Sequence, residues 1–314
     1  MAVISDEDLE KAVRSIPELS SFILYRNGEI LNEIYNNNGS ANRPANIKSA
    51  SKSVLSALTG IALNLGYIDS IDDPVSRYLP GYFENVDDSL KYSITVRHLL
   101  MMNSGLRSTS FRNYGAWVLS RDWVGYALKG PLNNQPGTTM TYSTGDTHIL
   151  SAVLTEASGM STRQLAEQYL FSPMGQNIGG WDRDPRGYFF GGNNMAVSPR
   201  ALLEFGKLYL NGGRYNNMQI LDPEWVEESL TIYQRSISFN SRRHDYGYLW
   251  WHNTFHGYQV WFAWGYGGQY LFLIPELNAA VVLTGNPDTR SRGTNNRIYS
   301  VMENSIIPYL SAPE

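Results

Sequence analysis

Ser49 and Lys52 are the residues whose types and spacing most directly suggest chemistry. They form a Ser-x-x-Lys motif, and an amphipathic run over residues 53–65 follows at once. Residues three apart share one face of an α-helix, so the Lys52 amine can reach the Ser49 hydroxyl. A helix N-terminus adds partial positive charge and unpaired amide donors, which stabilise an oxyanion. The motif predicts either an activated serine nucleophile or a plain helix start, with Ser49 as the cap and Lys52 in solvent.

The elements that hold this motif are predicted from turn residues and hydrophobic periodicity. A β-hairpin is expected over 21–35, around an Asn-Gly turn, and a helix begins at Ser49. From about 66 to 186 the chain is predicted to form short helices and loops, because Pro and Gly interrupt it repeatedly. The longest helix candidate in this stretch covers 147–157.

The C-terminal third predicts the rest of a sheet. Short apolar segments separated by Gly or Pro turns indicate three strands, at 257–263, 270–274 and 279–284. A final helix is expected over about 294–310.

These elements predict an α/β protein of the α+β type. An antiparallel sheet of five or more strands is assembled from both chain ends and flanked by helices. A mostly helical region is inserted in the middle. We therefore expect a sheet domain formed by 1–66 and 187–314, a helical domain formed by 67–186, and an active site between them.

Composition limits the partners. The 314 residues are 42% hydrophobic and 17% charged, which is enough for a large core and argues against disorder. The formal net charge is −4 and the sequence has no Lys/Arg run, so neither nucleic acid nor a membrane surface is expected as a partner. The sequence contains no cysteine, which excludes disulfides, thiol catalysis and Cys-ligated zinc.

The sequence shows no basic-then-apolar leader and no apolar run of membrane-spanning length. If the chain is complete we expect a cytoplasmic protein, and if a leader has been removed we expect a periplasmic or secreted one. Composition leaves the oligomeric state open.

Several further segments accompany the Ser-x-x-Lys motif in a fixed order. They are 73–80 (DPVSRYLP), 94–100 (ITVRHLL), 104–106 (SGL), 136–137 (PG), 142–144 (YST), 170–175 (LFSPMG) and 265–269 (GYGGQ). Together they cover about residues 20 to 285 and resemble the serine β-lactamase and penicillin-recognising superfamily, on its class C side. That side also contains esterases and 6-aminohexanoate-dimer hydrolase. The resemblance implies a β-lactamase-like fold and a serine hydrolase that needs no cofactor.

By this resemblance Tyr142 is the tyrosine of the second motif. A phenol has a reference pKa near ~10 and is a poor base unless its anion is favoured. We expect the Lys52 ammonium to lower that pKa, so that Tyr142 or neutral Lys52 takes the Ser49 proton and later passes one to the leaving group. Which of the two is the resting base stays open, and a lone tyrosine among 21 is otherwise a core residue.

The segment 265–269 stands where the family has its third motif. By resemblance the backbone amides of Tyr266 and Ser49 form the oxyanion hole, in which each donor is worth roughly 3 kcal/mol. Gly265 and Gly267 permit close backbone approach to substrate. The same glycines would equally serve a bulge or a hairpin turn.

Two departures from the family pattern bear on the substrate. Thr144 stands where β-lactam-hydrolysing relatives have Asn, and one hydroxyl cannot replace a two-ended amide. The third motif also lacks the Lys or His that sits near a substrate carboxylate. We therefore expect a carboxylesterase of short-chain esters or a linear amide hydrolase, working on a small, uncharged substrate. A β-lactamase or D-Ala-D-Ala-type peptidase and a non-catalytic binding protein remain the alternatives.

Further candidates for substrate contact are weaker. Asn193 lies before a family-like helix start, where it contacts substrate or forms a turn. Six large aromatic residues either line an apolar acyl pocket or belong to the core: Trp117, Trp123, Trp250, Trp251, Phe262 and Trp264.

Other enzyme classes find no support. The five histidines form no His-Glu-x-x-His motif, and the i, i+4 pair His252 and His256 lies in a segment predicted as strand and turn. No metal site is therefore expected. A Gly-x-Ser-x-Gly nucleophile elbow is also absent from the sequence.

Overall fold

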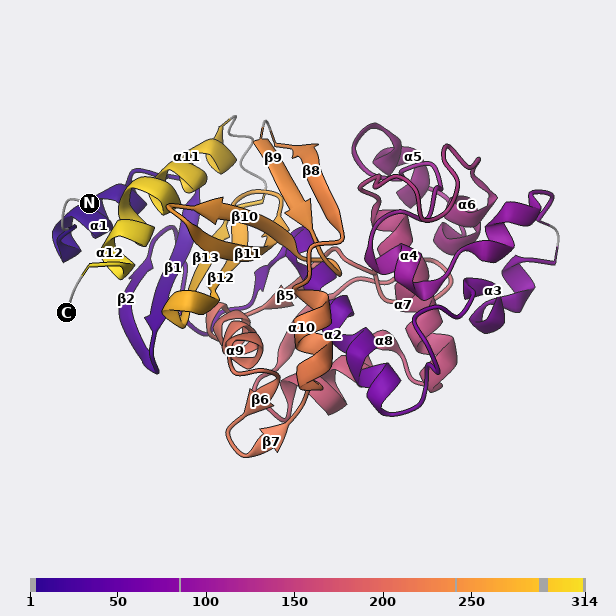
Figure 1. The fold of residues 1–314 in the computed structure, drawn as a ribbon, viewed down its shortest axis with the longest axis horizontal. Helices are drawn as coiled ribbons and strands as arrows, with labels where there is room; N and C mark the ends of the chain where they lie inside the picture. The colour runs from indigo at the N-terminus through magenta and orange to yellow at the C-terminus, as the bar shows by residue number, and fades with distance from the viewer. Residues whose placement is uncertain (1–3, 85, 241, 288–292, 313–314) are drawn as a thin grey trace.

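The computed structural model describes residues 4–84, 86–240, 242–287 and 293–312 (Figure 1). Its main sheet has eight antiparallel strands in the order β2-β1-β13-β12-β11-β10-β9-β8. The strands are β1 (Leu19–Arg26), β2 (Glu29–Tyr35), β8 (Gln234–Phe239), β9 (Arg242–Tyr246), β10 (Trp251–Phe255), β11 (Tyr258–Gly265), β12 (Gln269–Ile274) and β13 (Ala279–Gly285). Because β1 pairs with β13, the two chain ends meet inside one sheet, as the sequence predicted.

The predicted hairpin and the three predicted C-terminal strands are confirmed as β1, β2, β11, β12 and β13. The segment of His252 and His256, predicted as strand and turn, forms β10 and the turn after it, and β8 and β9 add two strands that the sequence did not predict. Strand β8 is at the sheet edge and mixes exposed and half-buried residues, so it lacks the apolar run that marks the central strands.

Helices cover both faces of the sheet, and the alternation of β12 shows why. Tyr270 packs edge-on against Tyr299 of α11 (Thr294–Val301), with ring centroids 5.9 Å apart. On the other face, Leu271 and Leu273 lie against Gly206 of α9 (Pro199–Leu210). Successive side chains of a strand point to opposite faces, so an entirely buried strand needs a helix on each side.

The remaining helices are mostly short. They are α1 (Asp6–Arg14), α2 (Ser51–Asn64), α3 (Val75–Tyr78), α4 (Val96–Leu100), α5 (Tyr114–Val118), α6 (Trp123–Lys129), α7 (Thr144–Ser158), α8 (Thr162–Ala166), α10 (Pro223–Ser229) and α12 (Ile307–Leu310). Two small sheets complete the fold, with strands β3 (Ala45–Asn46), β5 (Met195–Val197) and β4 (Ile178–Trp181) in one and β6 (Arg214–Tyr215) and β7 (Met218–Gln219) in the other.

Helices α3 to α7 gather at the end of the molecule away from α1 and α12 (Figure 1). Helix α7 is central to this group, since it packs against α2, α4, α6 and α8. It covers the predicted helix but begins three residues earlier, at Thr144. Helix α2 contacts both α7 and β11, so the predicted boundary near residue 66 crosses a shared core and the division into two domains stays a prediction.

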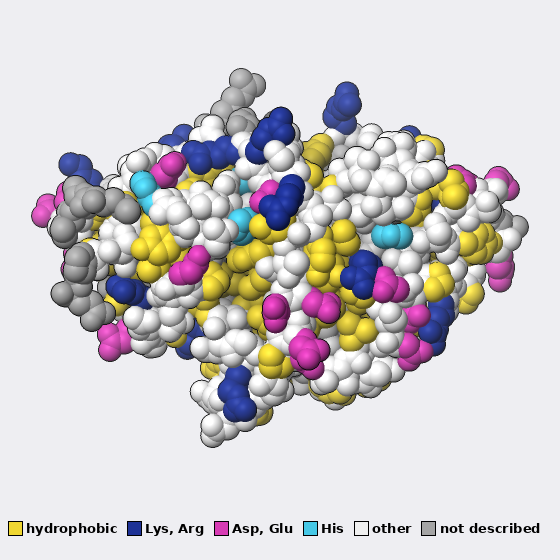
Figure 2. All heavy atoms as spheres, in the orientation of Figure 1, with side chains coloured by type: hydrophobic (Ala, Val, Ile, Leu, Met, Phe, Trp, Pro, Cys, Tyr) yellow, Lys and Arg dark blue, Asp and Glu magenta, His cyan; other side chains and the backbone are white. Residues whose placement is uncertain are grey.

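The surface is mixed in charge. Figure 2 shows Lys and Arg side chains scattered among Asp and Glu on the face in view. Within the described ranges, every helix is too short or too polar to span a bilayer. The expectation of no nucleic-acid or membrane partner stays a prediction.

Candidate active site

Ser49 lies in a single 3-10 turn, Lys48–Ala50, which leads directly into α2. The first turn of α2 brings the Lys52 Nζ to 3.2 Å from the Ser49 Oγ, where it donates a hydrogen bond. Lys52 is 2% exposed, whereas Ser49 is half-buried and lines a pocket. The structure thus contradicts the alternative of a solvated lysine beside a plain helix cap.

Two more acceptors hold the Lys52 amine. Its Nζ donates to the Thr144 Oγ1 at 3.2 Å and to the Gly192 carbonyl at 2.6 Å. Gly192 has a φ of +73°, and a side chain there would meet the aliphatic stem of Lys52. Only glycine allows this backbone to approach the lysine so closely.

Burial sets the protonation of Lys52. Removal from water disfavours the charged form and lowers the pKa of Lys52 to about 7, against the attraction of the Asp146 carboxylate, which raises it. A substantial fraction of the lysine is therefore neutral near pH 7 and able to accept a proton.

Asp146 is the buried acid of the same site. It follows Thr144 on α7, is 1% exposed, and burial raises the pKa of its carboxyl to about 7. Hydrogen bonds from Ser104 and Ser143 and the charge of Lys52 act in the opposite direction. Lys52 and Asp146 therefore titrate as a coupled pair in the neutral range.

Tyr142 lies under the lysine, with the Lys52 Nζ 5.1 Å from its ring centroid. Burial raises the pKa of Tyr142 well above its usual value, and hydrogen bonding to Ser49 offsets this only in part. The expectation that Lys52 would lower the pKa of Tyr142 is therefore wrong for the free protein, because burial is the largest influence and raises that pKa. The phenol stays protonated and suits proton donation better than proton removal.

Strand β11 brings the third motif to the nucleophile. A side chain on Gly265 would clash with the Ile47 carbonyl and crowd the Ala50 amide, so the end of the strand packs directly on the Ser49 turn. Tyr266 follows and lines the same pocket as Ser49. Gly267 has a φ of +84° and does not line that pocket itself, but it packs against Pro287, which does. The oxyanion hole of Ser49 and Tyr266 amides stays a prediction.

The pocket over Ser49 has a volume of about 360 Å³. It brings together most of the residues that the sequence singled out and several that it did not. Its lining residues are Lys48, Ser49, Ser110, Phe111, Tyr114, Tyr142, Thr144, Asn193, Trp264, Tyr266 and Pro287. Asn193 donates to the Tyr114 hydroxyl at 3.0 Å, which links the loop before β5 to α5.

Of the six aromatic residues considered for an acyl pocket, only Trp264 lines it. Trp117 and Trp250 are completely buried in the core, and Trp251 stacks on Tyr142 at 5.8 Å. Aromatic wall residues that the sequence missed, Phe111 and Tyr114, come from the inserted helical region. Nothing in their local sequence distinguishes them from core aromatics.

A buried histidine–carboxylate pair supports the loop that holds Lys52. The His148 Nε2 and the Asp184 Oδ2 are 3.0 Å apart, and both side chains are completely buried. The other ring nitrogen, Nδ1, accepts the Gly191 amide at 3.2 Å. Gly191 precedes the carbonyl that binds Lys52, so His148 fixes that carbonyl indirectly. No metal-binding or catalytic motif in the sequence included His148.

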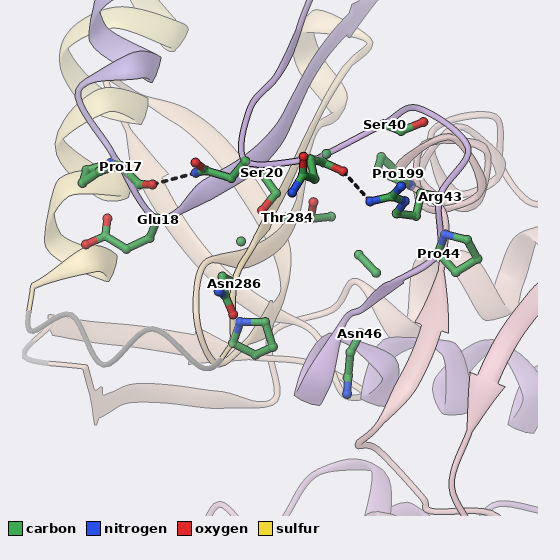
Figure 3. A pocket seen from close by; sticks show the side chains of 16 residues that line it. Pro17, Glu18, Ser20, Ser40, Arg43, Pro44, Asn46, Pro199, Thr284 and Asn286 are labelled. Atoms are coloured by element: carbon green, nitrogen blue, oxygen red, sulfur yellow. Dashed lines mark hydrogen bonds between the residues drawn. The ribbon is translucent and has the colours of Figure 1, made fainter.

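Figure 3 shows the surroundings of a larger hollow, of about 480 Å³. This hollow shares the lining residue Pro287 with the pocket over Ser49. Its wall mixes polar side chains with prolines, and Arg43 there donates to the Asn38 carbonyl at 2.9 Å. It contains none of Ser49, Lys52 and Tyr142, so we place the chemistry in the smaller pocket. Among the described residues, no group of three or more His, Asp or Glu side chains is placed to hold a metal ion.

Residues 10–301 match the Beta-lactamase family. The chain belongs to this family. It is 24% identical over 297 residues to the 6-aminohexanoate-dimer hydrolase of Paenarthrobacter ureafaciens, which covers 86% of this chain and 74% of that protein. The resemblance to the serine β-lactamase and penicillin-recognising superfamily is thus confirmed.

Solved structures confirm the β-lactamase-like fold. A candidate 6-aminohexanoate-dimer hydrolase from Bacillus anthracis superposes with a TM-score of 0.79 at 21% identity, covering 96% of this chain and 81% of that one. EstCE1, a hydrolase with promiscuous acyltransferase activity, gives a TM-score of 0.74 at 17% identity, covering 95% and 99%. These relatives support a serine hydrolase in general terms and leave the substrate open.

Proposed function

We propose that this protein is a serine acyl hydrolase that forms an acyl-enzyme on Ser49 and acts on short-chain carboxylic esters or linear amides. The observation that carries the proposal is the buried amine of Lys52, 3.2 Å from the Ser49 hydroxyl at the base of a pocket. A neutral amine in hydrogen-bond reach of a serine is a competent general base.

The acylation step follows from this arrangement. Neutral Lys52 takes the Ser49 proton while the serine oxygen bonds to the substrate carbonyl carbon. The backbone amides of Ser49 and Tyr266 hold the oxyanion that forms. When the carbon–oxygen or carbon–nitrogen bond breaks, Tyr142 donates its proton to the leaving group and regains one from the Lys52 ammonium. Water then repeats the sequence as the second nucleophile and releases the acid.

The substitution at Thr144 favours this chemistry over β-lactam hydrolysis. Its hydroxyl already accepts from Lys52 and lies 3.0 Å from the Ser110 hydroxyl. It therefore offers a substrate amide less than an asparagine side chain would. A β-lactamase or D-Ala-D-Ala-type peptidase is the second candidate, supported by the family match, and a non-catalytic binding protein is the third.

Burst kinetics separate the three candidates. p-Nitrophenyl acetate and butyrate would be mixed with wild type and with Ser49→Ala, with nitrocefin run in parallel. The proposal predicts a Ser49-dependent burst with steady ester turnover and little nitrocefin turnover. Fast nitrocefin hydrolysis would favour the lactamase, and no burst with any ester would favour a binding protein.

A further inference from the structure

Lys48 is the one charged side chain among the described residues that line the pocket over Ser49. Every other lining residue is apolar, aromatic, hydroxyl-bearing or an amide. Lys52 lies behind the wall, buried and held by Ser49, Thr144 and Gly192. Among the described residues, Lys48 is therefore the cation that a substrate in this pocket meets, and it directly precedes the nucleophile in the chain.

Within the part of the chain that the structure describes, Lys48 makes no ion pair. Its Nζ donates to the Asn194 Oδ1 at 3.1 Å, a neutral acceptor. The nearest carboxylate in this network, Asp182, binds the amide nitrogen of the same Asn194 at 2.9 Å. Asn194 thus separates the two charges, and the half-buried ammonium keeps donor capacity for a ligand.

The backbone at Lys48 is held in an unusual conformation. Its φ is +49°, a region that favours glycine and costs a side-chain-bearing residue about 1 kcal/mol. Asn46 stabilises the turn by accepting the Lys48 amide at 2.9 Å and by donating to Asn194 at 3.2 Å. The two asparagines thus hold both the backbone and the ammonium of Lys48 in place at the pocket wall.

We propose that Lys48 binds a carboxylate on the acyl chain of the substrate, so that the preferred substrates are esters or amides of dicarboxylic acids. This inference rests on the proposed hydrolase function and replaces the expectation of an uncharged substrate. The acyl chain stays bonded to Ser49 after the leaving group departs, and Lys48 is the neighbouring residue. In the family the cation belongs to the third motif, on the strand that faces the nucleophile. In this chain the cation is Lys48, in the 3-10 turn of the nucleophile itself.

Paired substrates that differ by one charge test this directly. The pairs are the mono-p-nitrophenyl esters of adipate and suberate, each compared with the same ester whose distal carboxyl is a methyl ester. These chains are long enough to limit intramolecular attack by the free carboxylate. The readout is the ratio of kcat/KM for the carboxylate over kcat/KM for the methyl ester, which cancels general losses of activity.

We expect this ratio to exceed one in wild type and to fall about tenfold in Lys48→Met, because a charge-assisted hydrogen bond at a half-exposed site is lost. Lys48→Arg should keep most of the preference, and Lys48→Glu should lower the ratio below that of Lys48→Met. An equal rate for both esters in wild type, or an unchanged ratio in Lys48→Met, overturns the inference while leaving the hydrolase intact.

If ester turnover is too slow to measure, labelling of Ser49 with an uncharged fluorophosphonate provides a second test. Monomethyl adipate should slow labelling of Ser49 more than dimethyl adipate does, and Lys48→Met should remove the difference. Equal protection by both compounds overturns the inference. Complete lack of Ser49 labelling and of turnover contradicts the proposed hydrolase function and this inference with it.

Discussion

Lys52 decides the pH dependence of the proposed chemistry. Burial lowers its pKa to about 7, and only the neutral amine accepts the Ser49 proton. Activity is therefore lost as pH falls through that value, and kcat/KM for an uncharged ester should rise through pH 7 to a plateau. A profile that stays flat through pH 7 would contradict neutral Lys52 as the base.

Asp146 affects the pKa of Lys52. Its carboxylate raises the pKa of Lys52, so Asp146→Asn removes that attraction and lowers the lysine pKa further. The rising limb of the kcat/KM profile should shift to lower pH. Asp69→Asn, which changes an exposed carboxylate, is the matched control and should leave the limb in place. A shift to higher pH in Asp146→Asn would refute the assigned coupling.

Tyr142 is expected to donate a proton rather than to remove one. Tyr142→Phe should lower kcat about 10²- to 10³-fold, the usual contribution of one general acid, while the limb near pH 7 remains. Steady-state rates across pH would show this. If Tyr142→Phe abolished the rise near pH 7 as well as lowering kcat, that rise could not be assigned to Lys52 alone.

At single residues, the sequence was informative where chemistry depends on side-chain type. Ser49, Lys52 and Tyr142 were predicted, and the structure places them together. The Gly192 carbonyl was missed, because any residue supplies a carbonyl and no sequence pattern identifies it. The direction of the Tyr142 pKa was also missed, since burial depends on tertiary packing.

The loop after β4 positions Lys52 through the Gly192 carbonyl. His148 holds this loop by accepting a hydrogen bond from the Gly191 amide. His148→Ala removes that acceptor and should lower kcat roughly ten- to a hundredfold with little change in KM, because a small displacement of a catalytic group is costly. His148→Asn places an oxygen near the Nδ1 position and should restore part of the rate.

A matched control separates positioning from stability in this loop. Ser151→Ala removes another buried hydrogen bond of α7, from the Ser151 Oγ to the Phe189 carbonyl at 2.8 Å, without changing the Gly191 contact. Thermal unfolding of His148→Ala and Ser151→Ala would show whether the two variants are equally destabilised. If His148→Ala and Ser151→Ala lost kcat equally, His148 would have only a structural role.

Elements with strong local patterns were predicted and those without them were not. The apolar strands β11 to β13 and helix α7 follow from periodicity. Strand β8 lacks such a pattern, because one side of this edge strand is solvent-exposed. Helix α7 begins earlier than expected because the backbone amides of Thr144 and Gly145 donate to the side-chain hydroxyls of Ser110 and Thr109, which lie in a distant segment of the chain.

Across the molecule, helix α2 joins the sheet and the helical region into one core. Leu58→Ala in this helix, at a completely buried position, should cost about 2–5 kcal/mol of unfolding free energy. Hydrogen exchange should show equal losses of protection in α7 and β12. A loss confined to one of them would show that the two regions unfold separately, as the predicted domain division implies.

The proposed function depends on a covalent acyl group on Ser49, which intact-protein mass spectrometry can detect. Wild type mixed with p-nitrophenyl butyrate and quenched during the burst should gain the mass of one butyryl group, which peptide mapping locates to Ser49. Ser49→Ala should gain none. An acyl group on another residue, or equal labelling of Ser49→Ala, would contradict the account.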